Sequence, residues 1–91
     1  MNIYKELEAH RVKVILDKLF PNGVDAPVAL KILWIYSPST LYLINEDLAL
    51  DAERIPYEVI DRLSFSLYEI DEEERKIVED YCLYVVLKYY H

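Results

Sequence analysis

The sequence predicts an all-α protein, a small bundle of four to five helices in a single domain over residues 1–91. Apolar residues recur at a spacing of three to four in several segments, as they do on one side of a helix. Pro, Gly, Asn, Ser or Asp, the residues that start and stop helices, bound these segments. Apolar residues make up 54% of the chain and Gly occurs once, so the chain can fold around a modest core.

We expect the first helix at about residues 2–20. Asn2 can cap its start, and Ile3, Leu7 and Val14 supply an apolar side that continues through residues 16–20. The sequence Pro-Asn-Gly at 21–23 then ends the helix.

The segment VALKILWIYS, residues 28–37, is apolar all round. Its periodicity therefore does not separate a buried helix from a central strand. The start favours a helix, because Asp25 can cap it and Pro27 stands in the first turn, where its missing N–H costs nothing. The alternative is an α+β fold with a hairpin at residues 31–45, in which ILWIY and TLYLI pair across Ser-Pro-Ser.

Ser37 and Pro38 resemble a cap followed by Pro at the first helical position. A helix that began there could continue through the sequence STLYLINEDLAL, with Leu41, Ile44 and Leu48 directed inward.

After Pro56 the spacing of apolar residues predicts another helix, over residues 56–70. Its inward residues would be Val59, Ile60, Leu63, Leu67 and Ile70. The last helix is expected to start at Asp71, with Glu74 three residues later as a capping box requires.

The net charge of −7 is unevenly distributed along the chain. Residues 1–36 hold five basic and four acidic residues, and residues 37–91 hold five basic and thirteen acidic ones. Binding to nucleic acid depends on Lys and Arg at the phosphates, so we expect no direct binding to nucleic acid. A basic protein is a more suitable partner, although an acidic surface also simply keeps a domain soluble.

The most acidic stretch surrounds the start of the last helix. Asp71 to Glu74 meet the positive end of the helix dipole, and Glu72 with Lys76 has the spacing of a helical ion pair. This pattern is typical of a solvated helix face. Alternatively, the same carboxylates could imitate DNA and occupy the basic groove of a nucleic-acid-binding protein. The acidic face would then comprise Glu69, Asp71, Glu72, Glu73, Glu74, Glu79 and Asp80.

Nothing in the sequence indicates catalysis, a metal or a cofactor. His10, Cys82 and His91 are isolated from one another, and no acidic stretch has the ligand spacing and Gly of a calcium loop. Cys82 stands in an apolar stretch where a thiol stays protonated, and one Gly cannot easily build a phosphate loop. We therefore expect a protein that is not an enzyme.

The C-terminal sequence YCLYVVLKYY, residues 81–90, has apolar side chains in every direction around a helix. A terminal helix usually buries one stripe, so either this helix is central or its second side contacts another chain. In the second case we expect a homodimer or a permanent partner. The interface residues would be Tyr81, Tyr84, Val85, Leu87 and Tyr89, with Trp34 and Tyr36 as weaker candidates.

The expected location is the cytoplasm, without a membrane. Apolar runs are shorter than the ~18 residues of a membrane span, and the start of the sequence does not resemble a signal peptide. The single Cys82 suits a reducing compartment.

Residues 60–79, IDRLSFSLYEIDEEERKIVE, resemble a C-terminal segment of DNA adenine methyltransferases of the fused restriction–modification type. The matching residues are Asp61, Leu63, Phe65, Leu67, Tyr68, Glu72, Glu73, Glu74, Ile77, Val78 and Glu79. The family usually has Gly after the Tyr, where this chain has Glu69. The family's Asn-Pro-Pro-aromatic and Gly-rich motifs are missing, so the resemblance implies a non-catalytic helical module of restriction or modification machinery.

The sequence thus predicts a non-enzymatic acidic helical module that docks through a Tyr-rich C-terminal helix, onto itself or a partner. The alternative is an acidic inhibitor of a nucleic-acid-binding protein, of the kind that phages use.

Overall fold

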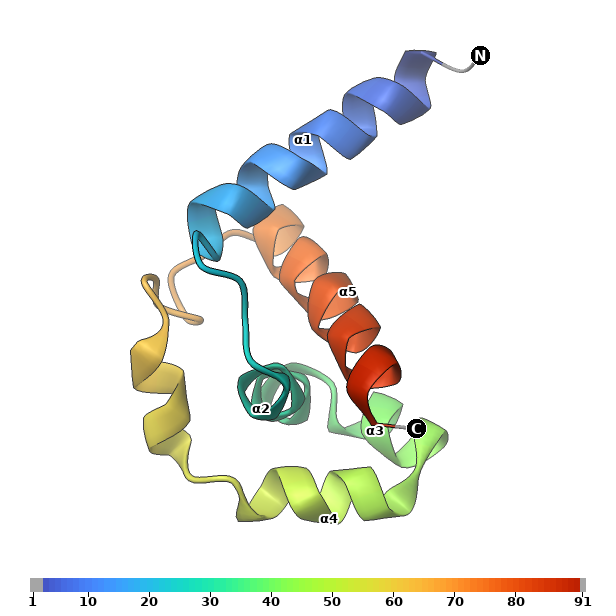
Figure 1. The fold of residues 1–91 in the computed structure, drawn as a ribbon, viewed down its shortest axis with the longest axis vertical. Coiled ribbons are helices and arrows are strands. Elements are labelled where there is room, and N and C mark those ends of the chain that lie inside the picture. Colours follow the sequence, from blue (N-terminus) through green and yellow to red (C-terminus); the bar gives the residue numbers. More distant parts are fainter. Residues whose placement is uncertain (1–2, 91) are drawn as a thin grey trace.

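The computed structural model describes residues 3–90 and confirms the all-α prediction. Within that range the chain forms five α-helices and one 3₁₀ helix, with no strand (Figure 1). The elements are α1 (Ile3–Leu19), α2 (Ala26–Tyr36), α3 (Pro38–Ile44), α4 (Glu46–Arg54), η1 (Tyr57–Arg62) and α5 (Glu72–Tyr89). The predicted cap at Asn2 and the residue His91 lie outside the described residues.

Helix α2 is the central element, and its position explains why its sequence is apolar all round. It packs against α5, α4, α3 and η1, and every residue from Val28 to Leu33 is buried. The alternative hairpin at residues 31–45 is wrong, because these residues form α2 and α3. Asp25 and Ser37 stand at the predicted helix starts, but neither side chain makes a capping hydrogen bond.

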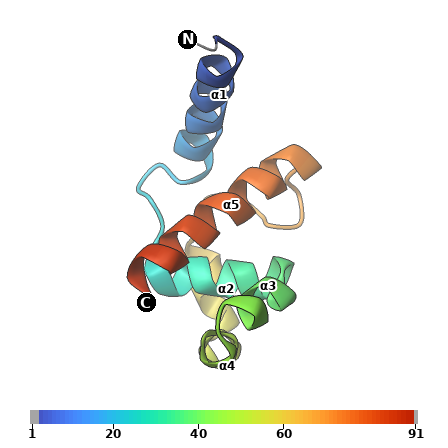
Figure 2. The same cartoon turned by 90° about the vertical axis from the view of Figure 1, so that its right-hand side faces the viewer.

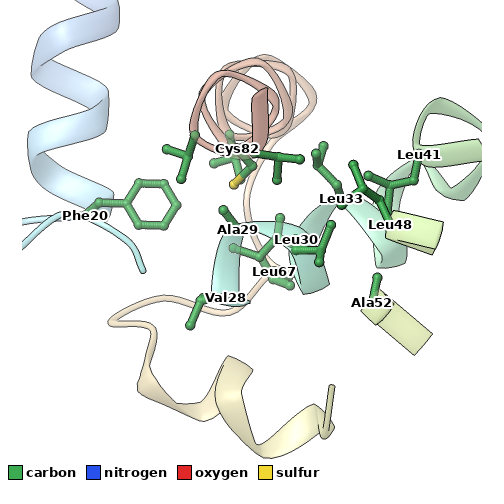
Figure 3. Close-up of a cluster of buried hydrophobic side chains, with 14 of the residues drawn as sticks. Phe20, Val28, Ala29, Leu30, Leu33, Leu41, Leu48, Ala52, Leu67 and Cys82 are labelled. Atoms are coloured by element: carbon green, nitrogen blue, oxygen red, sulfur yellow. The ribbon is translucent and has the colours of Figure 1, made fainter. Parts of the chain in front are cut away.

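The core forms where α2 meets α5, α3, α4 and the loop before α5. Figure 3 shows Cys82 of α5 over Ala29 and Leu30 of α2, with Leu41 and Leu48 beyond Leu33. Phe20 closes the end near α1, where its ring lies edge-on to Phe65 with centroids 5.3 Å apart. Residues far apart in the sequence therefore share one core.

The helix predicted to continue from Pro38 to Leu48 is divided in two. Asn45 ends α3 and caps α4, because its side-chain oxygen accepts a hydrogen bond from the Asp47 amide at 2.8 Å. This break buries Leu41 and Leu48 but leaves Ile44 36% exposed. The inward position predicted for Ile44 is wrong for that reason.

The helix predicted over residues 56–70 is also wrong. Only the short η1 forms, and residues 63–71 follow as turns and loop. Ser64 donates a hydrogen bond to the Leu19 carbonyl, and Ser66 accepts one from the Tyr68 amide. The bond from Tyr68 to Ser66 is local and offers the backbone an alternative to helix, whereas the bond from Ser64 ties the loop to the end of α1. Leu67 is nevertheless buried.

Helix α5 begins as predicted. The Asp71 carboxylate accepts a hydrogen bond from the Glu74 amide at 2.8 Å, and Glu74 reaches back to the Asp71 amide at 3.4 Å. This capping box fixes the start of the helix.

Helix α1 projects from the rest of the molecule (Figures 1 and 2). Its C-terminal half packs through Ile15, Leu16 and Leu19, while its N-terminal part diverges from α5. Within residues 3–90 no single helix is both long and apolar enough to cross a membrane. Helices α2 and α3 would reach that length only together, and the chain bends by 116° between them.

Candidate interaction surface

A groove of about 790 Å³ lies between α1 and the N-terminal half of α5, two helices that diverge from each other (Figure 1). Leu7 and Val12 of α1 and Ile77 of α5 supply its apolar lining. Charged side chains surround them, and Arg11 of α1 reaches across to Glu73 of α5 with its nitrogen 2.6 Å from the carboxylate. The complete lining is Leu7, Glu8, Arg11, Val12, Glu72, Glu73, Lys76, Ile77 and Asp80.

The N-terminal helix carries apolar side chains that the fold does not bury. Ile3 is 63% exposed, Leu7 61% and Val14 52%. The apolar side predicted for α1 is therefore covered only in part. Leu16, Leu19 and Phe20 pack on the core, whereas Ile3, Leu7 and Val14 remain exposed. Hydropathy alone does not separate these two groups of residues, because the difference depends on where the rest of the chain packs against α1.

The Tyr-rich helix α5 also presents apolar side chains, but not all those predicted for an interface. Tyr84, Leu87 and Tyr89 are exposed. Val85 is 5% exposed and belongs to the core, where it cannot touch another chain. Tyr81 is half-buried, with its ring centre 5.5 Å from that of Phe20.

Ile77, Tyr84 and Leu87 are seven and three residues apart, so they follow one side of α5. Ile77 lines the groove, so Tyr84 and Leu87 extend the apolar side of α5 from the groove towards the C-terminal end of the helix. We refer to the groove residues together with Ile3, Val14, Tyr84 and Leu87 as the α1–α5 surface.

Trp34 and Tyr36, the weaker candidates for interface residues, pack inside the chain. The Tyr36 hydroxyl donates a hydrogen bond to the Leu67 carbonyl at 2.6 Å, and burial raises the pKa of Tyr36 to about 12. Trp34 is half-buried, with its ring centre 6.1 Å from that of Tyr42. Neither residue belongs to the α1–α5 surface.

The acidic face is largely engaged within the chain. Glu73 pairs with Arg11, and Glu74 lies 3.8 Å from Lys18. The remaining pairs, within α5, are Arg75 with Glu79 and Lys76 with Asp80, each at 3.7 Å. Among the described residues the spacing of Glu72 and Lys76 produces no ion pair. Glu69 and Glu72 are exposed.

The side chains of Cys82 and of the acidic residues are candidates for a nucleophile and for metal ligands. Cys82 is fully buried, and this burial raises the pKa of its thiol to about 12. A protonated buried thiol is a poor nucleophile and a poor metal ligand. In the part of the chain that the structure describes, no three His, Cys, Asp or Glu side chains are grouped to hold a metal ion.

No protein-family model, curated protein or solved structure matches this chain. The resemblance of residues 60–79 to restriction–modification methyltransferases therefore stays a prediction.

Proposed function

We propose that this chain is a non-enzymatic helical docking module that binds another protein through the α1–α5 surface. The observation that carries the proposal is the apolar groove between α1 and α5, together with the exposed apolar side chains that each helix carries outside it: Ile3 and Val14 on α1, and Tyr84 and Leu87 on α5. Apolar residues that gather in this way mark interaction sites more often than isolated exposed ones do.

The shape of the surface supports a helix as the bound element. An apolar groove between two helices accepts the apolar side of a third helix. Here Leu7, Val12 and Ile77 would contact that side, while charged residues at the rim set its orientation. Tyr84 adds a large area with a polar tip, which suits the border of such an interface.

The acidic-inhibitor alternative has less support. Glu73, Glu74, Glu79 and Asp80 all have a cationic neighbour within the chain. Ion pairs at the surface contribute only ~0–1 kcal/mol each, so a basic partner could still replace those of the exposed Glu73 and Asp80. The alternative predicts binding that weakens strongly as salt rises, whereas docking of apolar side chains is much less sensitive to salt.

The proposal can be tested by capture of partners from the source cell, with wild-type and variant chains at low and high salt. We expect capture to persist at high salt and to be lost in Tyr84→Asp and Leu7→Asp. Leu43→Asp is the matched control, because Leu43 is 88% exposed on α3, outside the α1–α5 surface. A restriction or modification subunit among the captured proteins would fit the resemblance of residues 60–79.

Two results would contradict the proposal. Capture that is equal in all three variants would remove the α1–α5 surface as the binding site. Capture that disappears at high salt and in a Glu72→Lys, Glu73→Lys, Asp80→Lys variant, but not in Tyr84→Asp, would support the acidic inhibitor instead.

A further inference from the structure

We propose that a second copy of the chain binds the α1 side of the α1–α5 surface, through antiparallel pairing of the two α1 helices. The inference rests on the docking function proposed above and names one partner for it. It depends on the spacing, the exposure and the charges of α1.

Four residues of α1 form a continuous exposed stripe. Ile3, Leu7, His10 and Val14 are separated by four, three and four residues, which is the spacing of a coiled-coil contact. All four are exposed, and the three apolar ones are each more than half exposed. We call Ile3, Leu7, His10 and Val14 the α1 stripe.

The α1 stripe is complementary to itself when two copies run antiparallel. A two-fold axis between Glu8 and Ala9 places Ile3 of one copy opposite Val14 of the second copy. The same axis places Leu7 opposite His10 of the second copy. Every contact occurs twice, as a two-fold interface requires. Leu7 packs on the apolar body of the imidazole, whose polar atoms remain at the edge.

The charges beside the α1 stripe favour the antiparallel direction. In that direction the flank that carries Glu6 and Lys13 faces the same flank of the second copy, so Glu6 of each chain meets Lys13 of the other. A parallel pair would stack Asp17 on Asp17 and place Lys13 beside Lys18, two contacts between like charges, and would gain only the pair of Glu6 with Arg11. The balance of charges therefore disfavours the parallel pair.

The projection of α1 makes this pairing sterically reasonable. The N-terminal part of the helix diverges from α5, so a second helix can lie along it without displacing the core (Figures 1 and 2). Leu7 belongs both to the α1 stripe and to the groove lining, so the paired helix also covers one wall of the groove.

The size of the contact limits its strength. Two 17-residue helices are each ~25 Å long, and their contact falls near or below the ~1,200 Å² of a stable interface. We therefore expect a dimer that dissociates on dilution through the micromolar range. Sedimentation over a wide range of concentrations measures its dissociation constant.

The central variant is Leu7→Glu, which should raise the dissociation constant at least ~10-fold by removing one buried leucine per chain. Leu43→Glu is the matched control and should leave the constant unchanged, because Leu43 is 88% exposed on α3. Circular dichroism verifies that both variants fold. A wild-type chain that is monomeric at every concentration, or a Leu7→Glu dimer as tight as wild type, would overturn the inference.

Charge exchange and cross-linking test the direction of the pair. Glu6→Lys and Lys13→Glu should each weaken the dimer, and the double variant should restore it. An equimolar mixture of Ile3→Cys and Val14→Cys chains should form a disulfide on mild oxidation, whereas each alone should not, while the buried Cys82 stays protected. Cross-linking of each variant alone would indicate a parallel pair and overturn the inference.

The two proposals can fail separately. If the wild-type chain is monomeric but Leu7→Asp still abolishes capture of a different protein, self-association is wrong and the docking function stands. If capture and self-association are both insensitive to Leu7, both proposals are wrong.

Discussion

Lys31 donates a hydrogen bond from Nζ to the carbonyl oxygen of Ala52 at 3.0 Å, although Lys31 is only 1% exposed on the central helix. Ala52 lies in the last turn of α4, where the helix dipole favours a positive charge. The same nitrogen lies 4.3 Å from the centre of the Tyr57 ring. The buried charge therefore joins α2, α4 and η1.

We predict that Lys31→Ala lowers the free energy of unfolding by about 2–4 kcal/mol, because it removes a charge-assisted hydrogen bond and a buried side chain. Urea denaturation measures the change. Lys88→Ala is the control, since Lys88 is exposed on α5 and should matter little. Equal stabilities of the two variants would show that Lys31 does not hold α4 in place.

Asp71→Ala should destabilise the chain by about 1 kcal/mol, because it removes the carboxylate that caps α5. Glu72→Ala, one residue further on, has no capping hydrogen bond and should have a smaller effect. Thermal unfolding followed by circular dichroism compares the two. If Glu72→Ala were the more damaging change, helix capping would not be the role of this acidic run.

Tyr36→Phe should cost about 1 kcal/mol, since the Leu67 carbonyl loses the hydroxyl that donates to it. The change should also loosen residues 63–71, which hydrogen exchange reports as faster amide exchange in that segment. Tyr42→Phe is the control, because Tyr42 is 49% exposed. Unchanged exchange in residues 63–71 would contradict the anchoring role of Tyr36.

Stability should decline as the pH rises from about 9 towards 12. Burial raises the pKa of Cys82 from 9.0 to about 12, so the unfolded thiol loses its proton in this range while the folded one keeps it. Tyr36, whose pKa is raised from 10.0 to about 12 mainly by burial, acts in the same direction at the upper end. Each group contributes a slope of at most ~1.4 kcal/mol per pH unit.

Urea denaturation at several pH values measures this slope. Cys82→Ala should make it shallower, at the cost of some stability from the vacated volume. At pH 8 the native thiol should react slowly with an aromatic disulfide reagent, and the unfolded thiol rapidly. Rapid reaction of the native thiol would show that Cys82 is not protected.

Local signals in the sequence were sufficient for most of the helices. The structure confirms three predicted helix starts: the one marked by Pro27, the one marked by Ser37 and Pro38, and the one marked by the capping box of Asp71 and Glu74. These predictions succeeded because a helix start depends on a few neighbouring residues. The break at Asn45 and the loop at residues 63–71 were missed, because the spacing of apolar residues is equally compatible with a longer helix.

The amino-acid sequence alone is sufficient to predict the helical class, the acidic character and the surplus of apolar side chains. Which of those apolar residues stay exposed depends on the tertiary structure. Val85 and Tyr84 are neighbours in a uniformly apolar stretch, yet Val85 packs into the core and Tyr84 faces outward. Leu7 and Leu19 likewise belong to the same helix, and only Leu19 is covered. Hydropathy is a property of each residue, whereas burial depends on which helix packs against which side, and that is set by contacts between residues distant in the sequence.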